Sequence, residues 1–278
     1  MKNYTLAVSV LFFLFLSACT TIEITERDAF DAYRTVTPET FNIDPYQLHD
    51  VNLQSEDGTE IDAWFLERDD ANATVIYYGG TGFLMVTSRT LIEAYRNVPV
   101  NILLLDYRGY GRSSGTPTVE GLKTDARVAY SYARSAAPSP QETIFVHGHA
   151  MGTFLAAMIA EEEEVAGYIL ESPITEVNRW TRRLVPWIAR PFVRFRIDQP
   201  IQDQNNLVRV ERINLPVLIM GGAFDDVTPF RMAEELYEAS ASTQKRLVEI
   251  AGAKHTDLPR YRQYRDVLVD FYARVGLD

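Results

Sequence analysis

The chain has 278 residues, which is long enough to bury the core of one sizeable α/β domain. Hydrophobic residues make up 46% and charged residues 23%, an ordinary balance for a soluble globular protein. The formal net charge of −11 argues against a nucleic-acid partner, because binding to phosphates requires clustered Lys and Arg side chains.

An apolar run, Leu6–Leu16, comes first and follows the positive charge of Lys2. The run is too short to span a bilayer as a mature helix. A positive start, a short apolar run and small residues behind it are typical of a secretory signal peptide, so residues 1–18 are predicted to be one.

The apolar run ends in Leu-Ser-Ala-Cys, residues 16–19, which resembles a bacterial lipobox. The resemblance implies cleavage before Cys19 and lipidation of its sulfur, so that residues 19–45 are a lipidated tether that leads into the fold. Thr20 in the next position implies the outer membrane of a bacterial envelope, with the protein facing the periplasm. The alternative is an ordinary secreted protein in which Cys19 occurs by chance. Cys19 is the one cysteine of the chain, so no intramolecular disulfide can form.

The remaining pattern predicts a sheet with helices between its strands. Residues 46–67 alternate around Asp57-Gly58, which indicates a β-hairpin. Short apolar runs typical of buried parallel strands follow at 73–78, 100–106, 143–148, 167–172, 216–221 and 245–250. Helical patterns are found at about 84–97, 118–136, 152–164, 230–241 and 258–275. Strands that alternate with helices predict a mostly parallel, doubly wound sheet with helices on both faces.

Residues 174–212 interrupt this alternation between two strands. They contain Trp180 and Trp187, eight arginines, no lysine and four acidic residues. We interpret them as an inserted, helical segment.

Five stretches that each follow a predicted strand carry most of the chemistry. They are "YYGGTGF" (77–83), "DYRGYGRSSGTPT" (106–118), "GHAMG" (148–152), "GAFDDVTP" (222–229) and "GAKHTDL" (252–258). In this order they resemble the α/β-hydrolase family, in particular its small serine hydrolases, over residues 46–275. In that family the catalytic triad runs nucleophile, acid, histidine along the chain. The resemblance implies an α/β-hydrolase domain over 46–278, with 174–212 as a helical lid.

By this resemblance Ala150 occupies the nucleophile position, where the family has serine. His255 is implied as the general base, and Asp225 as the acid that orients its imidazole. Asp226 is the competing acid, and the spacing of "DDVTP" favours Asp225.

The backbone N–H groups of Thr81 and Met151 are implied to form an oxyanion hole. Gly148 and Gly152 allow the sharp turn from strand into helix, and the N-terminus of that helix points its free N–H groups at the site. Backbone donors do not depend on a serine, so this hole is expected to be intact.

Alanine has no lone pair with which to attack a carbonyl carbon. The resemblance therefore implies a relative of serine esterases and acyl hydrolases that lacks normal serine-hydrolase activity as written. One alternative is a non-catalytic ligand-binding or scaffolding pseudo-hydrolase. Another is cofactor-free chemistry by a His255–Asp225 dyad. No cofactor is implied, and no cluster of His, Cys, Asp and Glu has metal-ligand spacing.

The implied lid has two interpretations. It can simply pack on the carboxyl edge of the sheet with its arginines in water. It can also select the substrate, with Trp180, Trp187, Phe192 and Phe195 lining an acyl pocket and the arginines meeting carboxylate or phosphate groups. The expected partners are a small-molecule ester or acyl lipid, and the membrane through Cys19.

Overall fold

The computed structural model describes residues 20–30, 43–136, 143–183, 185–186 and 188–276. The predicted signal peptide, Cys19 and Trp187 lie outside these residues. Within them, none of the helices combines the length and the apolar character that crossing a membrane requires.

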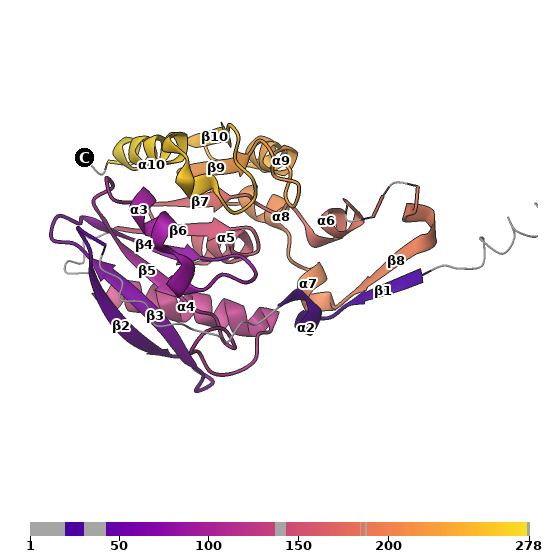
Figure 1. The fold of residues 1–278 in the computed structure, drawn as a ribbon, viewed down its shortest axis with the longest axis horizontal. Helices are drawn as coiled ribbons and strands as arrows, with labels where there is room; N and C mark the ends of the chain where they lie inside the picture. Colours follow the sequence, from indigo (N-terminus) through magenta and orange to yellow (C-terminus); the bar gives the residue numbers. More distant parts are fainter. Residues whose placement is uncertain (1–19, 31–42, 137–142, 184, 187, 277–278) are drawn as a thin grey trace, which may run out of the picture.

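Eight strands form the central sheet (Figure 1). They are β2 (Gln47–Gln54), β3 (Glu60–Glu67), β4 (Ala73–Tyr78), β5 (Val100–Leu105), β6 (Thr143–His149), β7 (Gly167–Glu171), β9 (Val217–Gly222) and β10 (Lys245–Ile250). The spatial order is β10-β9-β7-β6-β4-β5-β3-β2. The hairpin β2–β3 and the pair β3–β5 are antiparallel, whereas the remaining pairs are parallel. The prediction of a mostly parallel, doubly wound sheet is confirmed.

Helices cover both faces of the sheet. Every residue of β4, β5 and β7 is buried, because each of these strands packs against helices on both sides. One apolar cluster contains α4 (Val119–Ala136), α5 (Gly152–Glu162) and α9 (Arg231–Ala239), and the other contains α3 (Arg89–Ala94) and α10 (Arg262–Arg274). Short 3₁₀ turns, η1 (Met85–Thr87) and η3 (Leu258–Arg260), precede α3 and α10 where longer helices were expected.

The insertion is only partly helical, which corrects the expectation of a helical lid. It consists of α6 (Val177–Arg183), η2 (Arg190–Phe192), β8 (Val193–Ile197), α7 (Gln199–Gln202) and α8 (Asn206–Val210). In β8, half-buried Val193, Phe195 and Ile197 alternate with exposed arginines, so this stretch has the period of a strand.

The partner of β8 is β1 (Thr20–Ile24), in a separate two-stranded parallel sheet. β1 is followed by α2 (Glu26–Ala29), so this part of the predicted tether is structured. The register pairs Ile22 with Phe195 and Ile24 with Ile197, which places these apolar side chains on one face of the small sheet. We call residues 20–24 and 188–197 the arm. Figure 1 shows the arm projecting from the domain, beside α6.

Candidate active site

The turn from β6 into α5 has the geometry of a nucleophile elbow. Ala150 lies at its tip with φ +49°, a left-handed conformation that side chains with a Cβ rarely adopt. Its N–H donates to the Glu171 carbonyl at 2.9 Å. A Cβ on Gly148 would lie 2.4 Å from the Gly152 carbonyl oxygen, and a Cβ on Gly152 would lie 2.0 Å from the Tyr78 carbonyl oxygen. Both glycines are therefore required for the strand and the helix to approach this closely.

Asp225 and His255 come together from the loops that follow β9 and β10. The His255 Nδ1 lies 2.9 Å from the Asp225 Oδ2, and Asp225 is buried. This hydrogen bond leaves Nε2 as the ring nitrogen of His255 that is free to act on a reacting group. The competing acid, Asp226, is exposed to solvent. The geometry therefore favours Asp225, as the sequence spacing did.

The Asp225 carboxylate is held in its ionised form by its neighbours. Its Oδ1 accepts hydrogen bonds from the backbone N–H of Val227 at 3.0 Å and of Thr228 at 2.7 Å. Burial raises the pKa of Asp225, but the hydrogen bond and charge of His255 and the bonds from Thr228 outweigh it, so the pKa is lowered overall. An ionised Asp225 fixes the imidazole and stabilises the imidazolium form.

A cavity of about 730 Å³ brings together the residues that the sequence singled out. Ala150 and His255 both line it, and so do Thr81 and Met151. Most of the other lining residues are apolar: Ile22, Ile24, Ala29, Phe30, Val119, Leu122, Phe154, Leu155, Ile174, Val177, Trp180, Ile201 and Val227. Such a mostly apolar lining suits an acyl or other apolar group.

The four aromatic residues proposed for the lid differ in their positions. Phe195 lies in β8 and is not among the residues that line the cavity, which corrects the expectation for it. Trp180 lines the cavity, and its Nε1–H donates to the Val227 carbonyl at 3.0 Å. Phe192 is not among the lining residues and is 38% exposed in η2, which corrects the expectation for it. The reason is that the chain around it extends along β1 instead of folding over the site. Trp187 lies outside the described residues.

His149 is a site residue that the sequence did not predict. Its Nε2 lies 2.9 Å from the His255 carbonyl oxygen, and the two rings are 4.9 Å apart. Burial is the main reason that the pKa of His149 is lowered, so the neutral ring with a proton on Nε2 suits this contact. No local motif predicts that His149 contacts His255, because the contact depends on the path of the loop that follows β10.

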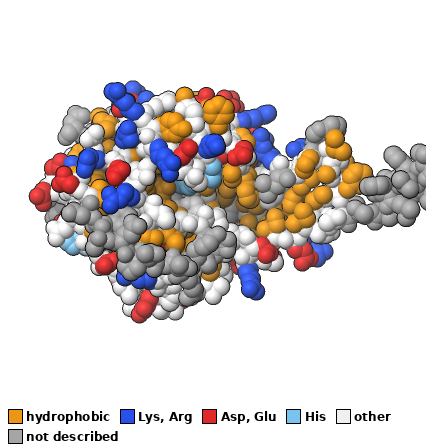
Figure 2. All heavy atoms as spheres, in the orientation of Figure 1, with side chains coloured by type: hydrophobic (Ala, Val, Ile, Leu, Met, Phe, Trp, Pro, Cys, Tyr) orange, Lys and Arg blue, Asp and Glu red, His pale blue; other side chains and the backbone are white. Residues whose placement is uncertain are grey.

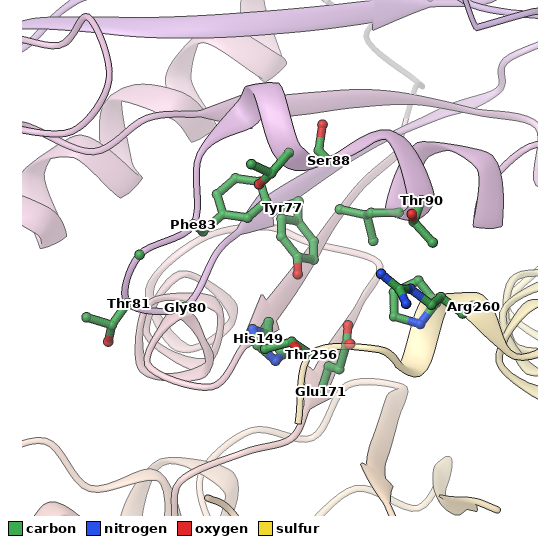
Figure 3. A pocket seen from close by; sticks show the side chains of 14 residues that line it. Tyr77, Gly80, Thr81, Phe83, Ser88, Thr90, His149, Glu171, Thr256 and Arg260 are labelled. Atoms are coloured by element: carbon green, nitrogen blue, oxygen red, sulfur yellow. The ribbon is translucent and has the colours of Figure 1, made fainter. Parts of the chain in front are cut away.

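His149 also lines a second, smaller cavity of about 250 Å³, on the other side of the loop that contains Thr81. Figure 3 shows this cavity, with the Tyr77 hydroxyl pointing toward His149 and Glu171. The carboxylate of Glu171 is buried and accepts a hydrogen bond from the Tyr264 hydroxyl at 2.9 Å.

Behind the elbow, Glu171 belongs to a buried polar network. Its Oε2 lies 3.0 Å from the His147 Nε2, and the His147 Nδ1 lies 2.7 Å from the Tyr95 hydroxyl. Burial raises the pKa of Glu171, but the close contact with His147, the charge of His149 and the hydrogen bond from Tyr264 outweigh it, so the pKa is lowered overall. Because the Glu171 carbonyl also holds the Ala150 N–H, this network anchors the turn that carries the site.

Neither cavity contains a metal-binding arrangement of side chains. Within the described part of the chain, no group of three or more His, Cys, Asp and Glu is placed to hold a metal ion.

A doubly wound sheet, a left-handed elbow between strand and helix, and an acid and a histidine on later loops define the α/β-hydrolase fold. The profile of the serine aminopeptidase S33 family matches residues 69–208, and the chain belongs to this family.

The similar proteins come from distant organisms. YfhR of Salmonella typhi is 28% identical over 284 residues, covering 95% of this chain and 94% of YfhR. The membrane protein YNL320W of Saccharomyces cerevisiae is 26% identical over 248 residues, covering 86% and 84% of the two chains. Among solved structures, an esterase of Pyrococcus furiosus superposes with a TM-score of 0.72 at 20% identity, covering 88% of this chain and 97% of the esterase. At this identity the likeness shows a shared fold.

Proposed function

We propose that this chain is an esterase-related protein that binds an ester or acyl ligand beside Ala150 but does not hydrolyse it by the serine route. One observation carries the proposal: Ala150, in the backbone conformation of a nucleophile, shares an apolar cavity with a hydrogen-bonded Asp225–His255 pair. The base, its orienting acid and the acyl-binding cavity are in place, and the missing group is one hydroxyl. Esterases among the structural neighbours support ester ligands as the substrate class.

The predicted inactivity follows from the chemistry of acyl transfer. A serine hydroxyl would pass its proton to His255 and form a bond to the carbonyl carbon, and the developing oxyanion would meet the Thr81 and Met151 N–H groups. The methyl group of Ala150 can neither lose a proton nor form this bond. Loss of the nucleophile lowers turnover by roughly 10⁶-fold in a serine protease with such a triad.

A second candidate is a binding or scaffolding function in which the site has no remaining capacity for catalysis. Its supporting observation is that Ala150, which has no nucleophilic group, lines a cavity of about 730 Å³ whose lining is mostly apolar. A third candidate, proton abstraction by the His255–Asp225 dyad, requires a bound substrate with an acidic C–H group and no nucleophile.

Equilibrium binding and turnover, measured side by side, separate these candidates. We expect the parent chain to bind a short-chain aryl ester without releasing the phenol, whereas the Ala150→Ser variant releases it. Turnover of the ester by the parent chain would contradict the proposal. Absence of both binding and turnover in a folded Ala150→Ser variant would contradict the assignment of the cavity.

We also propose that the protein is a lipoprotein of the bacterial envelope, attached through Cys19. The support is the sequence Leu-Ser-Ala-Cys after an apolar run, together with a relative that is named a membrane protein. We expect radioactive palmitate to label the parent chain and not the Cys19→Ser variant. Equal labelling of the two chains would contradict lipidation at this sulfur.

A further inference from the structure

We propose that the groove between α6 and the arm binds the phosphate groups of anionic phospholipids, and that the arm docks on a bilayer surface. This groove has a volume of about 590 Å³ and is separate from the cavity that contains His255. Arg182, Arg190 and Arg194 line it, together with the polar side chains of Asn178 and Thr181 and the ring of Phe195. The inference does not depend on the chemistry at position 150.

The segment from the end of α6 to the end of β8 has a charge opposite to that of the whole chain. Residues 182–197 contain five arginines and no acidic residue, in a chain whose formal net charge is −11. All five arginines are exposed. Arg196 forms an ion pair with Glu23 on the neighbouring strand, whereas the three arginines of the groove converge on one space. Guanidinium groups in this arrangement suit phosphate oxygens, which they can meet with two parallel hydrogen bonds.

The same region presents apolar side chains to solvent. Ile188 is 66% exposed, Ile22 is 39% exposed and Phe192 is 38% exposed, and all three belong to the arm. In Figure 2, hydrophobic side chains cover much of the arm and continue toward the domain. Apolar side chains flanked by arginines favour a surface with phosphates above hydrocarbon, as in a phospholipid monolayer.

The path of the chain also places the arm toward a membrane. The first described residue, Thr20, begins β1 at the outer end of the arm, where it pairs with Val193. Cys19, the proposed site of lipidation, directly precedes Thr20, so a lipid on its sulfur would bring the outer end of the arm to a membrane. Ile22 and Ile24 of the arm also line the cavity beside Ala150, so a docked arm connects the bilayer with that cavity.

Single-cysteine labelling tests where the protein meets the bilayer. Because Cys19 is the one cysteine, the full chain with Cys19→Ser accepts an environment-sensitive dye at a chosen position, Ile188→Cys on the arm or Val269→Cys on α10 as control. With vesicles that are about one third phosphatidylglycerol, we expect the dye at position 188 to shift to the blue and the dye at 269 to stay unchanged. Equal shifts at both positions, or no shift at 188, would overturn the docking surface.

Charge-matched variants test the groove. Replacing Arg182, Arg190 and Arg194 with Gln removes three charges, and each arginine near an anionic surface strengthens binding about fivefold, so vesicle affinity should fall roughly a hundredfold. The control chain replaces exposed Arg231, Arg262 and Arg274 with Gln and should bind as the parent does.

Vesicles of different composition and a control with inorganic phosphate show whether the groove binds the phosphate of a lipid headgroup or a soluble phosphate. Equal blue shifts with pure phosphatidylcholine would refute the preference for anionic lipid. The same shift at position 188 with inorganic phosphate alone would point to a soluble phosphate ligand and would also overturn the proposal. Because the labelled chains keep all three arginines, the result at position 188 decides the question even if the triple variant folds poorly.

Discussion

Restoring a single hydroxyl by Ala150→Ser should convert the site into a working esterase. The backbone at Ala150 already has φ +49°, so serine adds no strain that alanine does not already carry. Room for the larger group exists because Gly80 has no side chain: a Cβ there would lie 3.2 Å from the Ala150 Cβ. His255 is oriented by Asp225 at 2.9 Å and lines the same cavity, so the base for the new hydroxyl is in place.

The expected gain in kcat follows from the absence of a nucleophile in the parent chain. Removing the nucleophile from an intact triad costs roughly 10⁶-fold in kcat, about 8 kcal/mol of transition-state stabilisation. We expect the variant to recover at least about a thousandfold of this, since full recovery requires the new hydroxyl to lie in near-ideal geometry with His255 and the oxyanion donors.

The assay is release of p-nitrophenol from short-chain esters, together with labelling by a fluorophosphonate probe. The parent should give neither signal. The double variant Ala150→Ser, His255→Ala should lose most of the gain, because the imidazole activates the hydroxyl. A variant that is well folded by circular dichroism but inert toward ester and probe would refute the reasoning and favour the binding function.

Three further predictions concern the same elements. In the Ala150→Ser background, Asp225→Asn should lower kcat about 10⁴-fold while far-UV circular dichroism stays unchanged, because the imidazole loses the carboxylate that orients it. Ala150→Gly should raise the free energy of unfolding in urea by about 1 kcal/mol, since glycine adopts a positive φ without strain; a loss of stability would contradict this. Burial raises the pKa of Asp106 to about 7 in the folded protein. The folded state then holds a proton that the unfolded state has released, so stability should fall as pH rises from about 4 to about 7. Asp106→Asn should flatten that dependence in urea titrations at several pH values, and an unchanged slope would exclude Asp106 as its cause.

The sequence predicted the sheet well because its signal is local. The runs that became β4, β5 and β7 are mostly apolar, and the structure buries every residue of these strands. The preference for Asp225 over Asp226 could also be predicted from the sequence, because the spacing of the loop motif indicates which of the two carboxylates faces the histidine. The requirement for glycine at positions 148 and 152 could likewise be predicted from the motif, and in the structure a Cβ on either residue would clash with backbone atoms.

The features that the sequence did not predict depend on contacts between distant segments. Thr20–Ile24 contains four β-branched residues, but nothing in the sequence identifies its partner, Val193–Ile197, which lies more than 160 residues away. Phe192 was placed at the cavity on composition, although its position depends on that pairing. The position of His149 depends on the loop that carries His255. The alternation of Val193–Ile197 has the period of a strand but does not identify its partner, and the position of His149 leaves no periodic trace in the local sequence.

The pairing of β1 with β8 has a consequence for the order in which the molecule assembles. The ion pair between Glu23 and Arg196 joins residues 173 positions apart, so the arm closes a loop that contains most of the sheet. Closing so long a loop costs entropy that only two short strands offset, and local openings with so few contacts need little free energy. The arm should therefore form last during folding and detach first in the native state. Each detachment removes Ile22 and Ile24 from the wall beside Ala150, so the lifetime of the paired strands sets how often a bulky ligand can enter or leave.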